Sequence, residues 1–362
     1  MNHFGVNNEE YMQVIRESVF LSALRVFCAA FAAIIGVAIA VALVGFGLAL
    51  FSNSGISLPE EVQITIAPDA KGNVSMLHES APAIVRINIE GLIGEAELTT
   101  ERIERILYAS QQHPLAKGRV KGIFLYINSP GGIAYEADGI YRSLVKFKKD
   151  YNIPVYALVN GICASGGMYI AAAADKIYAT SESIIGSIGV VMGPTFNFSQ
   201  AMSKIGIESL TLTEGKDKDM LNPFRPWKTG EDSSLRNILS QLYNRFVDIM
   251  VTNRPQINKE HLIQDYGAQV FLADQALTIG YIDETNSNYD SSLSALTEAC
   301  GIAADTDYQV LSMSLPHSFL SSLVENKWDL LQGKITHEFK IGSHFTSSMC
   351  GKFLYLYEPA AL

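Results

Sequence analysis

The chain has 362 residues, of which 48% are hydrophobic and 18% charged. This composition excludes an intrinsically disordered chain, and the length suffices for one or two domains with a full core. The formal net charge of −10 disfavours a nucleic-acid partner, because surfaces that bind nucleic acid are basic.

Cysteine spacing gives no sign of a metal site. Cys28, Cys163, Cys300 and Cys350 match neither a zinc pattern nor a CxxC motif, and we expect no metal and no other cofactor. Cys28 lies in an apolar run and Cys163 stands two residues before Ser165, so neither is expected in a structural disulfide. Cys300 and Cys350 can either pair or remain free thiols.

An uncharged apolar run extends from Val26 to Phe51. As a helix it would be about 39 Å long, which is enough to cross a hydrocarbon core of about 30 Å with some tilt. A cleaved signal peptide is the alternative. The run is longer than the usual apolar region of a signal peptide, and the segment 1–25 before it carries Glu9, Glu10 and Glu17. The pattern therefore predicts a retained transmembrane anchor over 26–51.

Basic residues near the span predict its orientation. Arg16 and Arg25 precede it, and the next Lys or Arg is Lys71. Because positive charge stays on the cytoplasmic side, we expect segment 1–25 to be cytoplasmic and the remainder of the chain to be exported. Residues 52–82 are polar without clear periodicity, and we interpret them as a linker or stalk.

Residues 83–290 alternate between strand-like and helix-like patterns. The segment VKGIFLYIN (120–128) is a nearly continuous apolar run, as is typical of a strand buried in a parallel sheet. This order predicts an α/β domain with a parallel sheet and right-handed crossover helices. Strands are expected at 83–94, 120–128, 154–161, 175–179 and 183–193, and helices at 99–111, around 137–144 and after Ser165.

Two glycine-rich turns follow neighbouring strands: SPGG (129–132) and CASGG (163–167). The carboxyl ends of parallel strands meet at one edge of a sheet, where ligands usually bind. A serine at a strand-to-helix turn presents its hydroxyl there, and the bare backbones of Gly131 and Gly132 can approach a substrate carbonyl as an oxyanion hole. The alternative is that both motifs are simply tight turns where backbones pass closely.

A nucleophilic serine needs a base. The next histidine after Ser165 is His261, and His113 and His78 lie upstream; none has an obvious place in the crevice. A lysine can act instead if burial favours its neutral form. The candidate lysines are Lys176, Lys204, Lys216 and Lys218.

The remainder of the chain contains a long amphipathic helix, with apolar positions from Leu235 to Met250, and an extension over 291–362. Within the extension we predict a helix over 318–331. The segment KFLYLYEP (352–359) has alternating aromatic residues, which is typical of a half-buried edge strand. The role of this extension is not predicted.

Five segments between residues 83 and 290 together resemble signal peptide peptidase A, a family of membrane-anchored bacterial serine proteases. One SGG motif is present, so the resemblance is to the short, single-repeat form. The segments are INSPGG (127–132), CASGGMYIAAAADKIYA (163–179), SIIGSIGVVMG (183–193), EGKDKDMLNPFRPWKT (214–229) and GYID (280–283).

The resemblance implies a crotonase-like fold shared with the Clp protease subunit, and a Ser–Lys dyad. Ser165 matches the nucleophile, and Lys218, which closes the G-x-x-K segment 215–218, matches the base; Lys216 stays open as a second candidate. Ser187 matches the serine that orients the lysine. The oxyanion hole would be formed by Gly131 or Gly132 together with the N–H of Gly166.

The resemblance also implies partners and a location. The substrates would be spent signal peptides or similar apolar peptides, and the catalytic domain would lie outside the inner membrane. A neighbouring subunit of a ring could donate the lysine, so that oligomerisation completes the site. One feature conflicts with this reading: Glu214, Asp217 and Asp219 surround Lys218, and carboxylates favour the charged form of a lysine, which cannot act as a base.

Three alternatives remain at this level. The first is a catalytically inactive membrane scaffold of the same fold. The second is a crotonase-type acyl-CoA enzyme, although an exported domain would not meet cytoplasmic CoA. The third is a histidine-based triad that uses His261.

Overall fold

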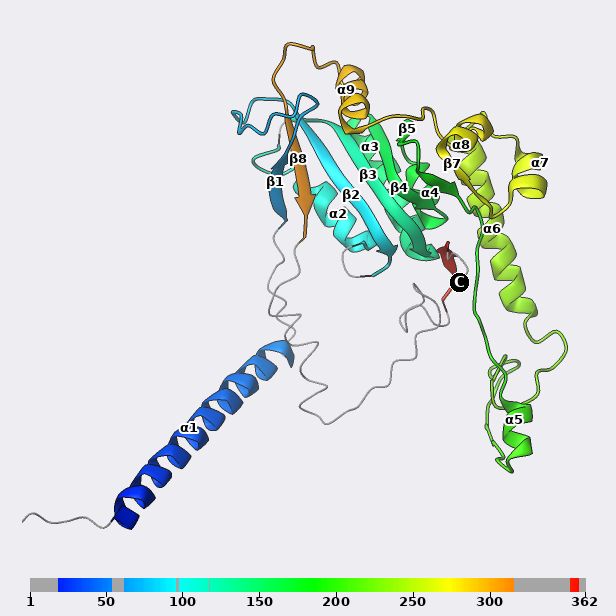
Figure 1. Cartoon of the computed structure of the whole chain (residues 1–362). Coiled ribbons are helices and arrows are strands. Elements are labelled where there is room, and N and C mark those ends of the chain that lie inside the picture. Colours follow the sequence, from blue (N-terminus) through cyan, green and yellow to red (C-terminus); the bar gives the residue numbers. More distant parts are fainter. Residues whose placement is uncertain (1–18, 54–61, 96–97, 117, 316–351, 358–362) are drawn as a thin grey trace, which may run out of the picture. The chain divides into compact units, whose positions relative to one another are not determined.

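The computed structural model describes residues 19–53, 62–95, 98–116, 118–315 and 352–357 (Figure 1). The chain divides into two units, 1–60 and 61–362, which are considered separately. The first unit contains one described helix, α1 (Val19–Asn53). Its stretch Ser22–Leu43 has a mean hydropathy of 2.8 and is long and apolar enough to cross a membrane. The helix predicted over 26–51 therefore forms; its insertion in a membrane stays a prediction.

The second unit is built on a nine-stranded sheet in the order β1-β8-β2-β3-β4-β6-β7, with β5 paired to β4 and β9 paired to β3. Strands β8, β2, β3 and β4 run parallel, as do β5 and β6 against β4, and β1, β7 and β9 pair antiparallel. The strands are β1 (Gln63–Ala67), β2 (Ala83–Ile93), β3 (Val120–Ile133), β4 (Val155–Ala164), β5 (Lys176–Ala179), β6 (Ile184–Gly186), β7 (Val270–Leu272), β8 (Gln309–Ser314) and β9 (Leu354–Leu356).

Helices cover both faces of the sheet, which explains why β3 reads as a continuous apolar run. Ile123 and Leu125 share a core cluster with side chains of α2, α3, α4 and α6, whereas Phe124 packs with α9 on the opposite face. The helices are α2 (Thr100–Ala109), α3 (Ala134–Tyr151), α4 (Gly166–Ala171), α5 (Ser199–Lys204), α6 (Ser233–Asn253), α7 (Lys259–His261), the π-helical turn η1 (Leu262–Tyr266), α8 (Ala273–Ile279) and α9 (Tyr289–Ala299).

The predicted parallel sheet with crossover helices is confirmed. One segment of the predicted linker differs: residues 63–67 form β1, which pairs with β8 in the register Gln63↔Ser314. The partner of β1 lies far along the chain, so local periodicity could not reveal the pairing. The predicted domain boundary at residue 290 also differs. Helix α9 (Tyr289–Ala299) and strand β8 (Gln309–Ser314) both pack in the same sheet domain.

The C-terminal strand is confirmed at β9, whereas the helix predicted over 318–331 lies outside the described residues. The strand expected at 183–193 is shorter, since β6 covers only Ile184–Gly186. Strand β3 is longer than expected. It continues through the SPGG segment to Ile133, with a register shift against β4 between Ile127 and Ser129.

An ion pair between the buried Arg254 and the partly buried Asp283 joins the end of α6 to the sheet. The Arg254 guanidinium, 2% exposed, donates to Asp283 Oδ2 at 2.6 Å, and the same oxygen accepts the Ile177 N–H of β5 at 2.8 Å. Burial alone would raise the pKa of Asp283, but the hydrogen bonds from Arg254 and Ile177 outweigh it, and the net pKa is lowered. The carboxylate is therefore a charged partner that Arg254 requires.

We predict that Asp283→Ala lowers the free energy of unfolding by about 3–5 kcal/mol, because it leaves the Arg254 charge buried without its partner. Urea denaturation of the full chain in detergent measures this. The exposed Asp274→Ala on α8 is the control, with a loss below about 0.5 kcal/mol. Since the folded pKa of Asp283 lies below the unfolded value of about 3.9, its contribution is complete above that pH and is lost on acidification. Equal losses in the two variants would contradict the prediction.

Candidate functional site

Ser165 stands alone between β4, which ends at Ala164, and α4, which begins at Gly166. Its backbone has φ 53° and ψ −114°, a conformation that residues with a side chain rarely adopt. Two hydrogen bonds hold it there: the Ser165 N–H donates to Gly186 O at 2.8 Å, and Ser165 O accepts the Tyr169 N–H at 3.0 Å. Such strain costs of order 1–3 kcal/mol and is concentrated at functional sites.

The Ser165 hydroxyl has no hydrogen-bonding role in the described part of the fold. The residue is 1% exposed, yet no described group hydrogen-bonds to Oγ. A serine hydroxyl that no described side chain engages, placed at a strained turn, is available for chemistry. This geometry favours the nucleophile over the tight-turn interpretation.

The three glycines predicted for an oxyanion hole lie together beside Ser165. A Cβ placed on Gly131 would be 2.7 Å from Gly166 N, and one on Gly132 would be 2.1 Å from Ile93 O. Only glycine permits both approaches, because a Cβ would meet backbone atoms that cannot move away. The end of β3 and the start of α4 are therefore in direct backbone contact.

Ser129, which the sequence reasoning missed, organises this segment. Its fully buried hydroxyl donates to Gly91 O at 2.6 Å and accepts the Gly131 N–H at 3.1 Å. The Gly131 N–H is therefore already bonded, which favours Gly132 as the donor from β3. A serine directly before Pro-Gly-Gly was the available signal, since serine hydroxyls commonly bond the backbone two residues on.

Ser187 lies next to Ser165 at the end of the adjacent strand. Strand β6 pairs with β4 in the register Ala164↔Gly186, so the two serines follow paired residues. Ser187 also has a positive φ of 53°, is 5% exposed, and donates its N–H to Gln269 O at 2.7 Å. The structure thus brings Ser187, Ser165 and the glycines together.

Lys218 is not part of this group within one chain. It belongs to an excursion, residues 192–230 between β6 and α6, in which no residue is buried. Figure 1 shows this excursion leaving the sheet after β6, passing through α5 and returning along α6. Lys218 and Lys216 are both exposed, and neither side chain forms an ion pair or hydrogen bond with a described residue.

Arg225 forms ion pairs at the end of the excursion next to α6. Its guanidinium binds Asp219 Oδ2 at 2.6 Å and Glu231 Oε2 at 2.7 Å. The hydrogen bond from Arg225 lowers the pKa of Asp219. One of the three carboxylates that surround Lys218 in the sequence is therefore neutralised by another partner.

Three of the other candidate bases have partners elsewhere. His261 Nδ1 contacts Asp265 Oδ2 at 2.5 Å, and His113 lies 3.6 Å from Glu79. Lys176 binds Asp283 at 3.2 Å. None of these three contacts Ser165, so the described part of the chain gives no support to a triad that uses His261 or His113.

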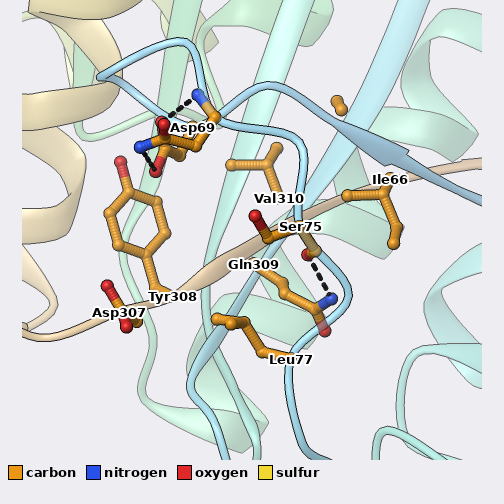
Figure 2. A pocket seen from close by; sticks show the side chains of 10 residues that line it. Ile66, Asp69, Ser75, Leu77, Asp307, Tyr308, Gln309 and Val310 are labelled. Carbon is orange, nitrogen blue, oxygen red and sulfur yellow. Dashed lines mark hydrogen bonds between the residues drawn. The ribbon is translucent and has the colours of Figure 1, made fainter.

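A cavity of about 200 Å³ lies between the loop after β1 and β8, and Figure 2 shows its lining. It is at the opposite end of the sheet from Ser165, because Gln309 pairs with Ala83, the first residue of β2. Its polar groups satisfy one another: Gln309 Nε2 donates to Ser75 O at 2.9 Å, and the Asp69 carboxylate accepts the Asn73 N–H at 2.8 Å. This cavity is therefore not part of the candidate site.

The strain at Ser165 is measurable. We predict that Ser165→Gly is more stable than Ser165→Ala by about 1 kcal/mol, because glycine tolerates a positive φ and alanine does not. The matched change Ala164→Gly, in regular β4, should instead lower stability by about 0.5–1 kcal/mol. Denaturation of the full-chain variants measures both differences. A Ser165→Gly variant no more stable than Ser165→Ala would show that the turn is unstrained.

Comparisons with known proteins agree with this geometry. The family model described as Peptidase family S49 matches residues 147–302, and the model described as Clp protease matches residues 50–223. A putative signal peptide peptidase SppA of Enterococcus faecium is 31% identical over 213 residues, which cover 58% of this chain and 61% of that protein. A putative protease of Methanocaldococcus jannaschii is 32% identical over 172 residues, which cover 48% of this chain and 54% of the relative.

Among solved structures, a ClpP1 mutant from Listeria monocytogenes aligns with 57% of this chain and 93% of its own, at 17% identity and a TM-score of 0.37. The chain thus spans less than two thirds of the length of the two curated relatives. The S49 match includes Ser165, Ser187 and Lys218, and the Clp match includes the glycine turns. The fold is the predicted α/β fold with a parallel sheet and crossover helices, and over residues 147–302 the chain is similar to peptidase family S49, with a putative signal peptide peptidase SppA among its relatives.

Proposed function

We propose that this protein is a membrane-anchored serine endopeptidase that hydrolyses peptides through a Ser165–Lys218 dyad. The observation that carries the proposal is Ser165 itself. Its backbone is held at a strained strand-to-helix turn, its hydroxyl is unengaged, and the bare backbones of Gly131 and Gly166 are in contact beside it. Similarity to the model of peptidase family S49 and relatives named as proteases support the same reaction class.

The proposed reaction has two stages. Ser165 Oγ attacks the scissile carbonyl carbon while Lys218 Nζ takes the hydroxyl proton, and the N–H groups of Gly132 and Gly166 hold the oxyanion. The C–N bond then breaks, and Lys218 returns the proton to the departing amine. In the second stage Lys218 deprotonates a water molecule, whose oxygen attacks the acyl carbon. The ester C–O bond to Ser165 then breaks, Lys218 returns the proton to Ser165 Oγ, and the carboxylic acid leaves. Ser187 orients the lysine by accepting a hydrogen bond from it.

The dyad is proposed to form between subunits of a homo-oligomeric ring. Within one chain Lys218 is exposed and lies on an excursion that has no buried residue. The excursion also exposes large apolar side chains, including Leu210 and Leu212, each 84% exposed. A cluster of this kind on a surface indicates a protein interface. Docking against a neighbouring copy would cover it, and would carry Lys218 to the neighbour's Ser165.

Burial at such an interface would also favour the neutral form of Lys218. A lysine removed from water shifts toward its neutral form, which can accept a proton. Asp219 is already paired with Arg225, so it does not oppose this shift as strongly as the sequence suggests. An isolated subunit would then be inactive, and assembly would create the complete site.

The proposed location is the inner membrane, crossed once by residues 26–51, with segment 1–25 in the cytoplasm and the peptidase domain outside. The uncharged helix α1 and the basic residues Arg16 and Arg25 support this arrangement. The proposed substrates are spent signal peptides or similar apolar peptides. They become available at the same membrane, and Val191 and Leu92 supply apolar surface near the glycine turns.

The dyad is tested by acylation of the full chain in detergent with a β-lactone probe, read by mass spectrometry. We expect label on Ser165, none in Ser165→Ala, and a rate reduced about 10²-fold or more in Lys218→Ala. The matched control Lys216→Ala should label at nearly the wild-type rate. Loss of labelling in Lys216→Ala but not in Lys218→Ala would move the base to Lys216. An unlabelled Ser165 in an assembled oligomer would favour the inactive scaffold.

Mixing tests the shared site. Ser165→Ala and Lys218→Ala are each expected to be inactive on a fluorogenic peptide. When their subunits are exchanged within oligomers, some sites should combine a wild-type Ser165 with a wild-type Lys218, and up to about a quarter of the activity should return. The control is a mixture of Ser165→Ala with the double variant, which should stay inactive. If exchanged oligomers recover nothing, the dyad forms within one subunit.

A further inference from the structure

The register between two central strands changes just before the candidate site. Strands β3 and β4 are neighbours in the sheet (Figure 1) and pair as Ile127↔Val159. The next pair is Ser129↔Cys163. One residue of β3 therefore stands opposite three residues of β4, 160–162, which form the β4 bulge. Bulges redirect the residues that follow them and are frequent next to active sites.

The β4 bulge decides which residues meet at the edge of the sheet. In a regular ladder Ser129 would pair with Gly161, and Ser165 would lie about 6.6 Å further along the strand, at about 3.3 Å for each of two residues. With the bulge, Gly131 and Ser165 each stand two residues beyond the pair Ser129↔Cys163. The backbone contact between the end of β3 and the start of α4 therefore depends on this register.

Asn128 is the single residue opposite the β4 bulge, and its side chain bonds the bulge directly. The exposed Asn128 Oδ1 accepts the Ile162 N–H at 3.1 Å, where a regular ladder would supply a backbone carbonyl. A Cβ on Gly161 would lie 2.6 Å from the same oxygen, and Gly161 has a positive φ of 118°. Glycine at this position therefore lets the bulge approach the amide closely.

Ser183 binds the opposite edge of the β4 bulge. Its fully buried hydroxyl accepts the Gly161 N–H at 3.4 Å and donates to Val159 O at 3.1 Å. Asn128 and Ser183 thus bind two consecutive backbone N–H groups of the bulge from its two sides. From Ile162 onward β4 pairs with β6 without a further shift, so the bulge is the last adjustment before Ser165.

A second register shift lies beside the first. Strands β2 and β3 shift between Glu90 and Leu92, where β3 has one extra residue. The Ser129 hydroxyl, which accepts the Gly131 N–H at 3.1 Å, holds this shift on the buried face. Because successive residues of a strand face opposite sides, Asn128 acts from the exposed face of β3. Two adjacent side chains therefore hold the two shifts that surround the glycine turn.

We propose that Asn128 is a positioning residue, which fixes the β4 bulge through the Ile162 N–H and so sets Ser165 level with the glycines of the oxyanion hole. The inference rests on the proposed peptidase function. Asn128 acts only through the backbone of β4 and does not touch the reacting atoms. A misplacement of about 1 Å between reacting groups can cost about 10²-fold in rate, so partial opening of the bulge is measurable.

Hydrogen exchange measures the Asn128 contact without any reaction. In the full chain in detergent, the Ile162 amide should exchange about fivefold faster or more in Asn128→Ala, which removes the acceptor. Asn128→Asp keeps a side-chain oxygen and should exchange within about twofold of wild type. The control is Asn88→Ala, which removes another amide from the same face of the sheet, where it accepts from Arg86 at 2.9 Å. This control should leave exchange at Ile162 unchanged.

Acylation of Ser165 by the β-lactone probe then tests the positioning. Asn128→Ala should be labelled about tenfold more slowly than wild type, whereas Asn128→Asp should stay within about twofold, because the rate follows the acceptor oxygen. Asn88→Ala should be labelled at the wild-type rate. On the fluorogenic peptide the loss in Asn128→Ala should appear in kcat with KM nearly unchanged, which a general loss of folded protein would not explain.

The possible results separate this inference from the proposed function. If acylation of Asn128→Ala stays within about twofold of wild type, or if Asn128→Asp loses as much as Asn128→Ala, the positioning role is overturned. Equal exchange at Ile162 in all variants would likewise show that the bulge is held without Asn128. If Ser165 is not labelled even in wild type, the peptidase proposal itself fails, whatever exchange shows about the bulge.

Discussion

The contact between three backbone segments around Ser165 is the constraint on which the remainder of the site depends. The end of β3 and the start of α4 meet so closely that a Cβ on Gly131 would lie 2.7 Å from Gly166 N. The Ser165 N–H is bonded to Gly186 O across this junction, which holds the serine at a positive φ. The strain is sustained because the sheet beneath is covered on both faces, so the strands cannot shift to relieve it.

The same arrangement leaves open strand edges. A sheet edge presents unpaired N–H and C=O groups, and proteins either cover such edges or use them to bind another strand. Here the edges at Gly131–Ile133 and Val191 are covered by β9.

The residues of the proposed site differ in their exposure to solvent. The nucleophile and the oxyanion glycines are buried in one subunit, and the proposed base lies on an exposed excursion whose apolar side chains lack a cover. Coupling the base to assembly would restrict hydrolysis to the complete oligomer. Arg225 binds Asp219 and Glu231 and so holds the end of the excursion next to α6. Lys218 takes no part in these ion pairs.

The sequence by itself determined the order of strands and helices, the apolar helix α1, and the meeting of SPGG with CASGG at one sheet edge. These follow from local periodicity and from the rule that parallel strands end together. It could not reveal that β1 pairs with β8, that Ser129 accepts the Gly131 N–H, or that β9 pairs with β3 at the glycine turn. Only the tertiary structure decided these, because each depends on groups that chain folding brings together, and pairing between distant backbones leaves no local pattern.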